Sequence, residues 1–308
     1  MRLLSQYSST GKQFFLKLLG LCVCCVNLNV LAATNAEQAD IAPLAQHSLL
    51  LDIVNQNNSL FVVGERGHLL RSHDCGKTWQ QIVVPTRVTL TAIHFYNNQL
   101  GWAVGHDGVI LKTADGGTTW KKVYEDIAAE QPLFDILFLN ENKGIVVGAY
   151  GAYLETMDGG ESWTKKTSIY GQDDFHLYRI SQLQSNKLLV TGESGVIYTS
   201  SDNGQTWHLI NSPYQGTYFG HITLQPESIL VFGMRGTIYR TDDLGYAWTQ
   251  VKSATDAALA AGLATKDGNV LIAGAGGTVL EVGPDSDQVK QNTKKHYGYI
   301  SAMTGCNG

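Results

Sequence analysis

Short apolar runs separated by turn residues fill most of the chain after residue 48. One stretch shows the unit clearly. An apolar run ends at Val104, a Gly-x-x-Gly turn extends from Gly105 to Gly108, a further apolar run follows, and an Asp-x-Gly turn begins at Asp115. Runs of this length, bounded by Gly, Asn and Asp, indicate β-strands joined by tight turns.

This unit recurs at a nearly constant interval. The glycine pairs of the first turn are Gly64/Gly67, Gly105/Gly108, Gly148/Gly151, Gly192/Gly195, Gly233/Gly236 and Gly274/Gly277. Successive pairs are 41, 43, 44, 41 and 41 residues apart. The second turn pairs an Asp with a Trp five residues later, at Asp74/Trp79, Asp115/Trp120, Asp158/Trp163, Asp202/Trp207 and Asp243/Trp248. A period of about 40 residues with several short strands is typical of β-propellers.

The repeats therefore predict an all-β propeller of four-stranded blades, with residues 48–308 as a single domain. Six repeats are recognisable, and the sixth keeps its Gly-x-x-Gly turn but lacks the Asp turn. After it, Tyr299–Met303 resembles the strand that opens each earlier repeat. Two arrangements are consistent with this pattern: a six-bladed ring in which the chain ends share a blade, or a ring with an incomplete seventh blade.

The N-terminal part has a different pattern. Arg2, Lys12 and Lys17 precede an apolar run, and small residues end at Ala33. This pattern predicts a secretory signal peptide over residues 1–33. Residues 34–47 are mostly small and polar, which predicts a linker or an edge strand. We therefore expect an exported, periplasmic protein. One version of this hypothesis places it at the surface of the inner membrane.

Two cysteines lie outside the predicted signal peptide. Removal of the signal peptide would leave Cys75, in the first repeat, and Cys306, near the end of the chain. If the ring closes, the first and last repeats are neighbours, and a disulfide between these two would clasp the ring in an oxidising compartment. The alternative is that the two cysteines are unrelated.

The recurring residues of the second turn have structural roles. The Asp carboxylate can accept backbone N–H groups within its own turn, and Gly permits a positive φ angle. The Ser or Thr hydroxyls can tie the ends of the turn. The Trp can pack the start of the fourth strand against its blade, and in the first repeat we expect that strand to begin at Trp79. Five copies in matching phase favour a scaffold role over catalysis.

These turns resemble the Asp-box (BNR) repeats of sialidases and many other propellers. Their spacing, together with the segment from Val62 to Leu70 before the first box, is similar to the repeat pattern of the photosystem II stability/assembly factor family. The resemblance covers roughly residues 48–303. It implies a seven-bladed exported propeller without enzymatic activity, which assists the assembly or stability of a membrane protein complex such as a photosystem.

Strand order predicts where a partner would bind. In an up-and-down blade, the Gly-x-x-Gly turns and the connections between blades share one face, which we call the Gly-turn face; the Asp boxes lie on the other. The variable residues of the Gly-turn face mix Arg, Tyr, His and acids, as protein-recognition surfaces do. The candidate partner-binding residues are Glu65, Arg66, Arg87, His106, Asp107, Tyr150, Glu193 and Arg235. Ordinary polar loop tips are the alternative interpretation.

The alternatives to partner binding are an enzymatic or glycan-binding function and a purely structural role. A sialidase needs three convergent arginines and a Tyr/Glu pair, and none of the Arg residues lies in such a motif. A glycan-binding or glycan-hydrolysing propeller remains the main alternative, and a structural module without a ligand is the third. The net charge of −5 argues against nucleic acid as a partner. Motifs for nucleotides, metals or other cofactors are missing from the sequence, so we expect none of these ligands.

Overall fold

The computed structural model describes residues 37–167, 169, 174–184, 186–286, 289–292 and 298–306. The predicted signal peptide therefore lies outside the described residues. Residues 35–308 form one compact unit. No helix in the described part of the chain is long and apolar enough to cross a membrane.

The unit contains six four-stranded antiparallel sheets, and in each the strands lie in chain order. The strands of blades 1 to 3 are β1 (Leu50–Gln56), β2 (Ser59–Gly64), β3 (Leu69–Ser72), β4 (Gln80–Ile82), β5 (Leu90–Phe95), β6 (Gly101–Gly105), β7 (Ile110–Thr113), β8 (Lys121–Tyr124), β9 (Leu133–Phe138), β10 (Gly144–Gly148), β11 (Tyr153–Thr156) and β12 (Thr164–Lys165). Those of blades 4 to 6 are β13 (Leu177–Gln182), β14 (Leu188–Gly192), β15 (Ile197–Ser200), β16 (His208–Leu209), β17 (Tyr218–Gln225), β18 (Ser228–Gly233), β19 (Ile238–Thr241), β20 (Thr249–Gln250), β21 (Leu259–Ala264), β22 (Val270–Gly274), β23 (Val279–Val282) and β24 (Val289–Gln291).

Short 3-10 turns complete the pattern. In the first five blades, one such turn follows the second strand: η2 (Glu65–Gly67), η3 (His106–Gly108), η5 (Ala149–Gly151), η6 (Glu193–Gly195) and η7 (Met234–Gly236). Two others, η1 (Ala45–His47) and η4 (Ile127–Ala129), lie outside the blades. Residues 37–47, expected as a linker or an edge strand, contain η1 and no β-strand. The all-β propeller prediction is confirmed.

The fourth strands begin one residue later than expected. In the five blades that have an Asp box, the fourth strand starts directly after the tryptophan of the box, not at it. The first ladder pair between β3 and β4 joins Arg71 to Gln80, and the residue before the tryptophan, Thr78, is still bonded to Asp74 of the box. The tryptophan therefore links the box to the strand. The five tryptophans that stand just before β4, β8, β12, β16 and β20 are Trp79, Trp120, Trp163, Trp207 and Trp248.

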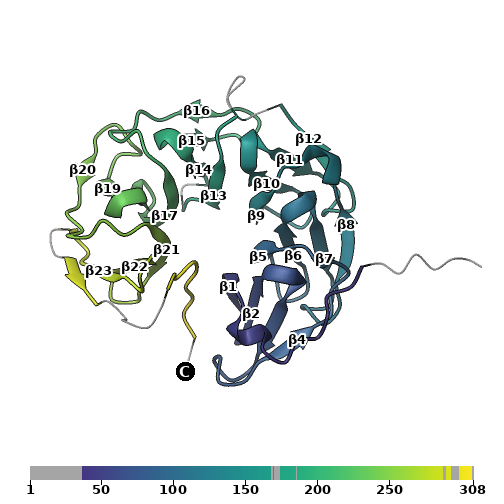
Figure 1. Cartoon of the computed structure of the whole chain (residues 1–308). Helices are drawn as coiled ribbons and strands as arrows, with labels where there is room; N and C mark the ends of the chain where they lie inside the picture. Colours follow the sequence, from purple (N-terminus) through teal and green to yellow (C-terminus); the bar gives the residue numbers. More distant parts are fainter. Residues whose placement is uncertain are drawn as a thin grey trace, which may run out of the picture. The chain divides into compact units, whose positions relative to one another are not determined.

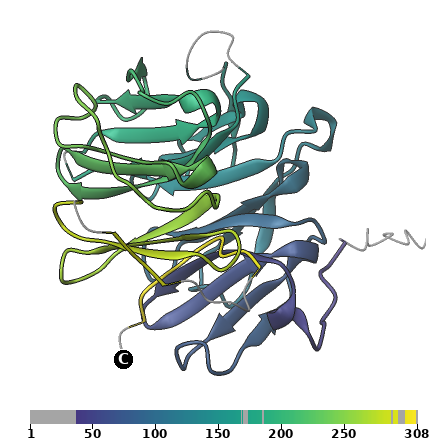
Figure 2. The ribbon, with the colours of Figure 1, turned by 60° about the vertical axis from the view of Figure 1, so that its left-hand side comes forward.

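The blades follow one another around a ring, with the first strand of each blade innermost (Figure 1). The inner strands contact their neighbours in the order β1, β5, β9, β13, β17 and β21. The sheets of successive blades face one another (Figure 2). Five apolar clusters fill the space between them, and each cluster joins two successive blades. The hydrophobic core is thus divided among five blade junctions.

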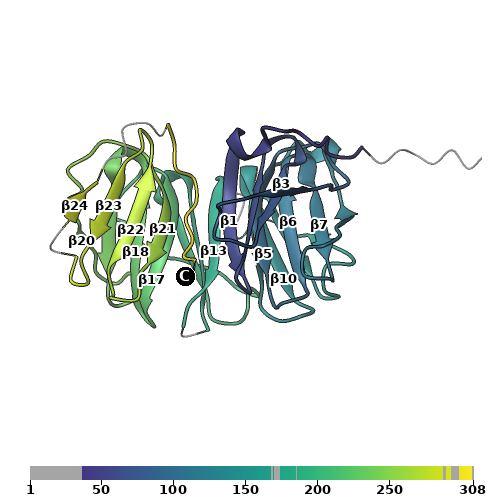
Figure 3. The same ribbon diagram turned by 90° about the horizontal axis from the view of Figure 1, so that it is seen from below.

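The sixth junction, between blade 6 and blade 1, is built differently. Residues 298–306 lie between β21 and β1 (Figures 1 and 3). Tyr299–Met303, predicted to open a further repeat, does not form a strand, because its only ladder contact is a bridge from Tyr299 to Ala275. The described residues therefore form six blades, where the family resemblance implied seven, and a single segment occupies the seventh position.

Candidate functional site: the central cavity and the Gly-turn face

The Gly-x-x-Gly turns are tightly fixed against the connections between blades. In blade 1, a Cβ atom on Gly64 would clash with the carbonyl oxygen of Leu49, so only glycine fits there. Glu65 N donates to the same carbonyl at 2.9 Å. The residue before the second glycine adopts a left-handed conformation in every blade, at Arg66, Asp107, Tyr150, Ser194, Arg235 and Gly276. For the five residues other than glycine, this backbone conformation costs about 1–2 kcal/mol.

The Asp boxes form self-contained turns on the opposite face. In the first box, Asp74 Oδ1 accepts a hydrogen bond from Thr78 N at 2.8 Å, and Ser72 Oγ accepts one from Gly76 N at 2.8 Å. The hydrogen bonds that Asp74 accepts from the Thr78 hydroxyl, from Thr78 N and from the Ser72 hydroxyl lower the pKa of Asp74 to about 2. The carboxylate is thus engaged by its own turn. The same backbone bond is accepted in the other boxes by Asp115, Asp158, Asp202 and Asp243.

Four of the five box tryptophans reach the preceding blade. Trp120 belongs to the cluster that joins blades 1 and 2, and its ring meets Phe95 edge-on at 6.0 Å. Trp163 belongs to the cluster that joins blades 2 and 3. The other two also donate a hydrogen bond across a junction: Trp207 Nε1 to the Tyr153 hydroxyl of blade 3 at 3.4 Å, and Trp248 Nε1 to Asn211 O, after blade 4, at 3.0 Å. These indoles therefore pack one blade against the next, whereas the sequence pattern predicted packing of each Trp against its own blade.

Trp79 differs from the other four tryptophans. It is half-buried, and it belongs to none of the five apolar clusters of the described residues. Its ring covers Gly76 of its own turn, where a Cβ atom would come within 3.3 Å of the indole. Because no packed blade precedes blade 1, Trp79 contributes to its own Asp box and not to an apolar junction.

The residues predicted for the partner surface lie on the Gly-turn face but not in one cluster. Arg66 and Arg235 are exposed on blades 1 and 5, and no contact between them is found among the described residues. Arg235 borders a separate polar hollow of about 400 Å³. Arg87 pairs with Asp40 at 2.9 Å. His106 is the one predicted residue that lines the central cavity.

The other predicted residues of this face help to hold its loops. Glu65 accepts a hydrogen bond from Leu49 N at 3.3 Å, and Glu193 accepts one from His176 N at 3.2 Å. Asp107 accepts one from Asp126 N through its backbone carbonyl at 3.0 Å. Tyr150 is 55 % exposed, and its ring meets His176 edge-on at 4.7 Å.

A cavity of about 410 Å³ lies in the centre of the ring. Each first strand has a register irregularity directly after its first residue, where it pairs with the second strand. The residue at this bulge is half-buried and lines the cavity in all six blades. The six bulge residues are Leu51, Thr91, Phe134, Tyr178, Phe219 and Ala260.

One side of the cavity is aromatic because three successive blades place a ring at the bulge. Phe134 and Tyr178 stack with ring centres 5.2 Å apart, and Phe219 meets Tyr178 edge-on at 5.1 Å. Tyr299, from the segment at the seventh position, also lines the cavity. This wall offers flat apolar surfaces that can stack on an apolar or aromatic group of a ligand.

Arg179 lies deeper, where the cavity meets a second hollow of about 310 Å³. Its side chain is enclosed by the ring yet 49 % accessible from the lumen, and its Nε lies 3.5 Å from Asp135 Oδ2. Asp52 lines the same two hollows. Burial raises the pKa of Asp52 to about 6, although the positive charge of Arg179 acts in the opposite direction. Burial likewise raises the pKa of Asp135.

The two carboxylates connect neighbouring blades. Asp52 accepts backbone hydrogen bonds from Ile53 and, in blade 2, from Ile93, both at 2.9 Å. Asp135 accepts the corresponding bonds from Ile136 and, in blade 4, from Ile180. Both oxygens of each carboxylate are therefore engaged by the backbone. By contrast, the guanidinium of Arg179 has only its ion pair with Asp135 among the described contacts, so its other N–H groups can bind a ligand in the lumen.

The bulge residues and Arg179 were not predicted as site residues. The signal available in the sequence was positional: each bulge residue directly follows the apolar residue that begins the first strand of a repeat. Their identities share no motif, because Leu, Thr, Phe, Tyr, Phe and Ala occupy this position in turn. The sequence pattern marks variable residues in the turns but gives no motif for the wall of the lumen.

Comparisons with known proteins agree with this architecture. The family described as "Photosynthesis system II assembly factor YCF48" matches residues 31–126 and 124–295. YCF48 from Cyanidioschyzon merolae has 18 % identity and a TM-score of 0.63, with 83 % of this chain and 88 % of that one covered. A YCF48 bound to a D1 peptide has 20 % identity and a TM-score of 0.64, with coverage of 80 % and 82 %.

An enzyme also shares the propeller fold. An ancestral GH74 enzyme has 14 % identity and a TM-score of 0.60, with 80 % of this chain and 38 % of the enzyme covered. No curated protein matched the chain. Identities this low show the fold alone, whereas the family match spans most of the sequence. The chain therefore belongs to the family of the photosynthesis system II assembly factor YCF48.

Proposed function

We propose that this protein is a non-enzymatic assembly or stability factor that binds a segment of a membrane protein on its Gly-turn face. The observation that carries this proposal is the lumen wall of bulge residues, which places three aromatic side chains above Arg179. Family membership and the structural similarity to a YCF48 bound to a D1 peptide support a peptide as the ligand.

The Gly-turn face outside the cavity, which we call the rim, suits a peptide that extends beyond the cavity. Large apolar side chains are exposed on the Gly-turn face, at Leu49, Ile127, Tyr150, Met234 and Tyr299. Such side chains can contribute apolar contacts to a bound protein segment. A bound segment would insert one apolar or aromatic side chain against the Tyr178 wall, and its neighbouring residues would cover this rim.

The proposal includes the cellular setting. The pattern of residues 1–33 supports export to the periplasm, where a propeller could meet the exposed parts of an inner-membrane complex. A photosystem II protein is the first candidate partner, and assembly intermediates of another membrane complex are the second. Neither nucleic acid nor a nucleotide has a place in this proposal.

One observation favours a second function. Aromatic walls also stack on sugar rings, and the chain shares its fold with a GH74 enzyme. Glycoside hydrolysis, however, needs two carboxyl groups free for proton transfer and nucleophilic or base catalysis. The carboxylates of Asp52 and Asp135 are occupied by backbone N–H groups. Glycan binding without hydrolysis is therefore the stronger form of this alternative.

A pull-down from detergent-solubilised membranes tests the proposal. The full chain is compared with Tyr178→Ala in the lumen and with an Arg66→Glu/Arg235→Glu double variant on the rim. Tyr246→Ala is the matched control, because Tyr246 is 93 % exposed in the Asp box of blade 5. We expect the parent and the control to retain the same membrane complex and Tyr178→Ala to lose it. Equal recovery by all four proteins would refute the site, and glycan-array binding without any complex would favour the alternative.

A further inference from the structure

The segment at the seventh position follows the course of a missing first strand. In blade 2, the bulge residue Thr91 donates its hydroxyl hydrogen to the carbonyl of Leu133, the first residue of the next inner strand. Ser301 donates in the same way to the carbonyl of Leu50 in blade 1, at 2.9 Å. Ser301 also lines the cavity, as the bulge residues do. The segment thus supplies the seventh piece of the lumen wall, although no sheet of its own stands behind it.

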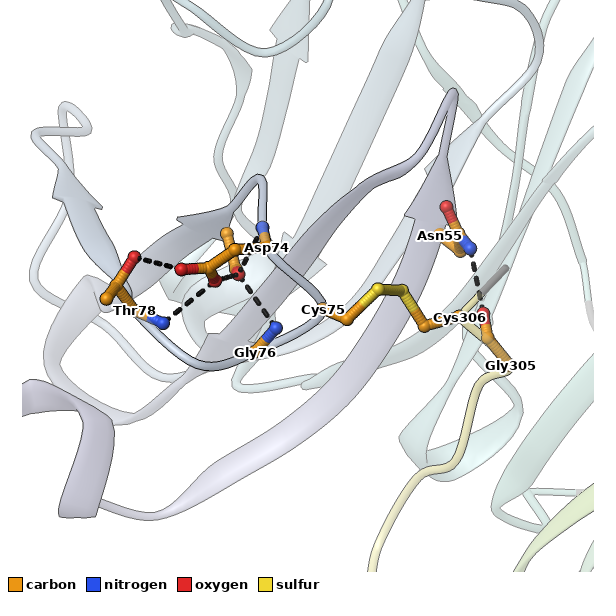
Figure 4. Close-up of a disulfide and its surroundings, with 8 residues drawn as sticks. Asn55, Asp74, Cys75, Gly76, Thr78, Gly305 and Cys306 are labelled. Atoms are coloured by element: carbon orange, nitrogen blue, oxygen red, sulfur yellow. Dashed lines mark hydrogen bonds between the residues drawn. A yellow bond between two sulfur atoms is a disulfide. The ribbon is translucent and has the colours of Figure 1, made fainter. Parts of the chain in front are cut away.

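The two ends of this segment are held by different interactions. At the Gly-turn face, backbone bonds fix it to blade 6: Gly276 N donates to Gly298 O at 2.6 Å, and Ile300 N donates to Gly274 O at 3.1 Å. Near the Asp-box face, it is held to blade 1 by Asn55 Nδ2, which donates to Gly305 O at 2.8 Å, and by the Cys75–Cys306 disulfide (Figure 4). The disulfide is therefore the only covalent link across the sixth junction among the described residues.

Cys75 stands at an unusual position for a cysteine. It has a φ of 59°, and the equivalent positions in the other four Asp boxes are Gly116, Gly159, Asn203 and Leu244, all at positive φ. Glycine and asparagine tolerate this left-handed conformation, whereas cysteine gains nothing from it. Leu244 shows that the turn also accepts an ordinary side chain, and Cys75 differs from it by its bond to Cys306. Cys75 is also exposed and Cys306 half-buried, so a reductant can reach the bond.

We propose that the Cys75–Cys306 disulfide is a redox latch that controls the ligand cavity. In the oxidised protein, the latch holds Tyr299, Ser301, Ala302 and Met303 in place as one wall of the cavity. Reduction frees the far end of the segment, and the cavity opens sideways between blades 6 and 1. A ligand held in the lumen then loses this wall and is released. This inference rests on the proposed function only for the identity of the ligand.

The chemistry requires a dithiol, such as a thioredoxin-like protein. One thiolate of the dithiol attacks a sulfur of the disulfide, which forms a mixed disulfide and expels the other cysteine as a thiolate. The second thiol of the reductant then resolves the mixed disulfide. Two electrons and two protons end on Cys75 and Cys306 as thiols, and the reductant becomes a disulfide. Reoxidation by a protein disulfide of higher potential reverses the step.

Five samples of the full chain test the latch: oxidised protein, protein with dithiothreitol, the Cys75→Gly and Cys306→Ser variants, and Cys75→Gly with dithiothreitol. Cys75→Gly is the matched control for the turn, because it restores the residue found in the second and third boxes. Dithiothreitol added to Cys75→Gly controls for Cys22, Cys24 and Cys25. Amide hydrogen exchange reports on residues 299–306, and the fluorescence of anilinonaphthalene sulfonate reports on the cavity.

We expect reduction and both variants to raise hydrogen exchange in residues 299–306. We also expect them to weaken dye binding by about tenfold, and dithiothreitol to have no further effect on Cys75→Gly. Unchanged exchange, or faster exchange with unchanged dye affinity, would overturn the latch. A D1 peptide is titrated separately. If it binds no sample, the D1 peptide is excluded as the ligand of the proposed function, while exchange and dye binding still decide the latch.

Discussion

Five junctions between blades and the sixth are held together by different physical means. At the junction of blades 2 and 3, buried residues of both blades form one apolar cluster, and Trp102 stacks on Phe138 with ring centres 3.4 Å apart. No such cluster joins blade 6 to blade 1 among the described residues. That junction relies on a short segment, a few polar contacts and the Cys75–Cys306 disulfide.

This difference shows how a repeat ring can combine rigidity with one adjustable position. A packed junction buries apolar surface on both blades, so opening it exposes that surface to water. A junction closed by a covalent bond opens when the bond is reduced, and little else must change. The adjustable junction also borders the cavity, which places its opening beside the candidate ligand site.

Trp102→Ala should break a packed junction and have the largest effect. The indole is fully buried between blades 2 and 3, so its removal leaves a cavity that the rigid strands cannot fill. We expect the free energy of unfolding to fall by about 3–5 kcal/mol. Guanidinium unfolding followed by fluorescence measures this change, with Tyr246→Ala as the exposed control. A loss similar to that of the control would mean that the junctions are not the source of stability.

Much of this architecture could be predicted from the sequence because its signals are local and periodic. The glycine pairs mark the turns after each second strand, and the Asp boxes form hydrogen bonds within a few residues of one another. The pairing of Cys75 with Cys306, 231 residues apart, was one of two alternatives that the sequence left open, and it depended on closure of the ring.

The cavity could not be predicted in the same way. Tyr178 and Arg179 both line the cavity because of the register irregularity of β13 against β14, and no turn motif encodes this irregularity. The candidate partner-binding residues Arg66 and Arg235 share a face because of strand order, yet they lie on turns of two different blades, 1 and 5. The course of Tyr299–Met303 also depends on contacts with blades 6 and 1 rather than on its own strand propensity.

Cys75→Gly tests the other kind of junction by equilibrium unfolding. The disulfide closes a very long loop, and its removal should lower the free energy of unfolding by about 2–4 kcal/mol, chiefly by freeing the unfolded chain. Because the new glycine suits the left-handed turn, damage to the first Asp box cannot explain the loss. Oxidised parent, reduced parent and variant are compared in urea. An unchanged midpoint in the variant would show that the disulfide contributes nothing to ring stability.

His221→Gln probes a polar group inside a packed junction and should have the smallest of the three effects. The His221 ring, in blade 5, hydrogen-bonds to the hydroxyls of Ser181 and Thr191 in blade 4, at 2.6 and 3.0 Å. Burial, and then the charge of Arg179, lower the pKa of His221 to about 3. The unfolded chain therefore binds a proton below about pH 6.5 that the folded protein excludes, so stability falls as the pH is lowered.

At about pH 5.5 this linkage should cost about 1.4 kcal/mol relative to neutral pH. Glutamine can still bond to both hydroxyls but cannot titrate, so the acid-induced loss should be smaller by that amount in the variant. Urea unfolding of both proteins at the two pH values gives the difference. His94, whose pKa is lowered by burial, also reduces the stability of the protein in acid. Asp52, whose pKa is raised, has the opposite effect on stability as the pH falls. Both groups remain in the variant, so the comparison isolates His221, and equal losses in the two proteins would show that the packed junction admits the proton.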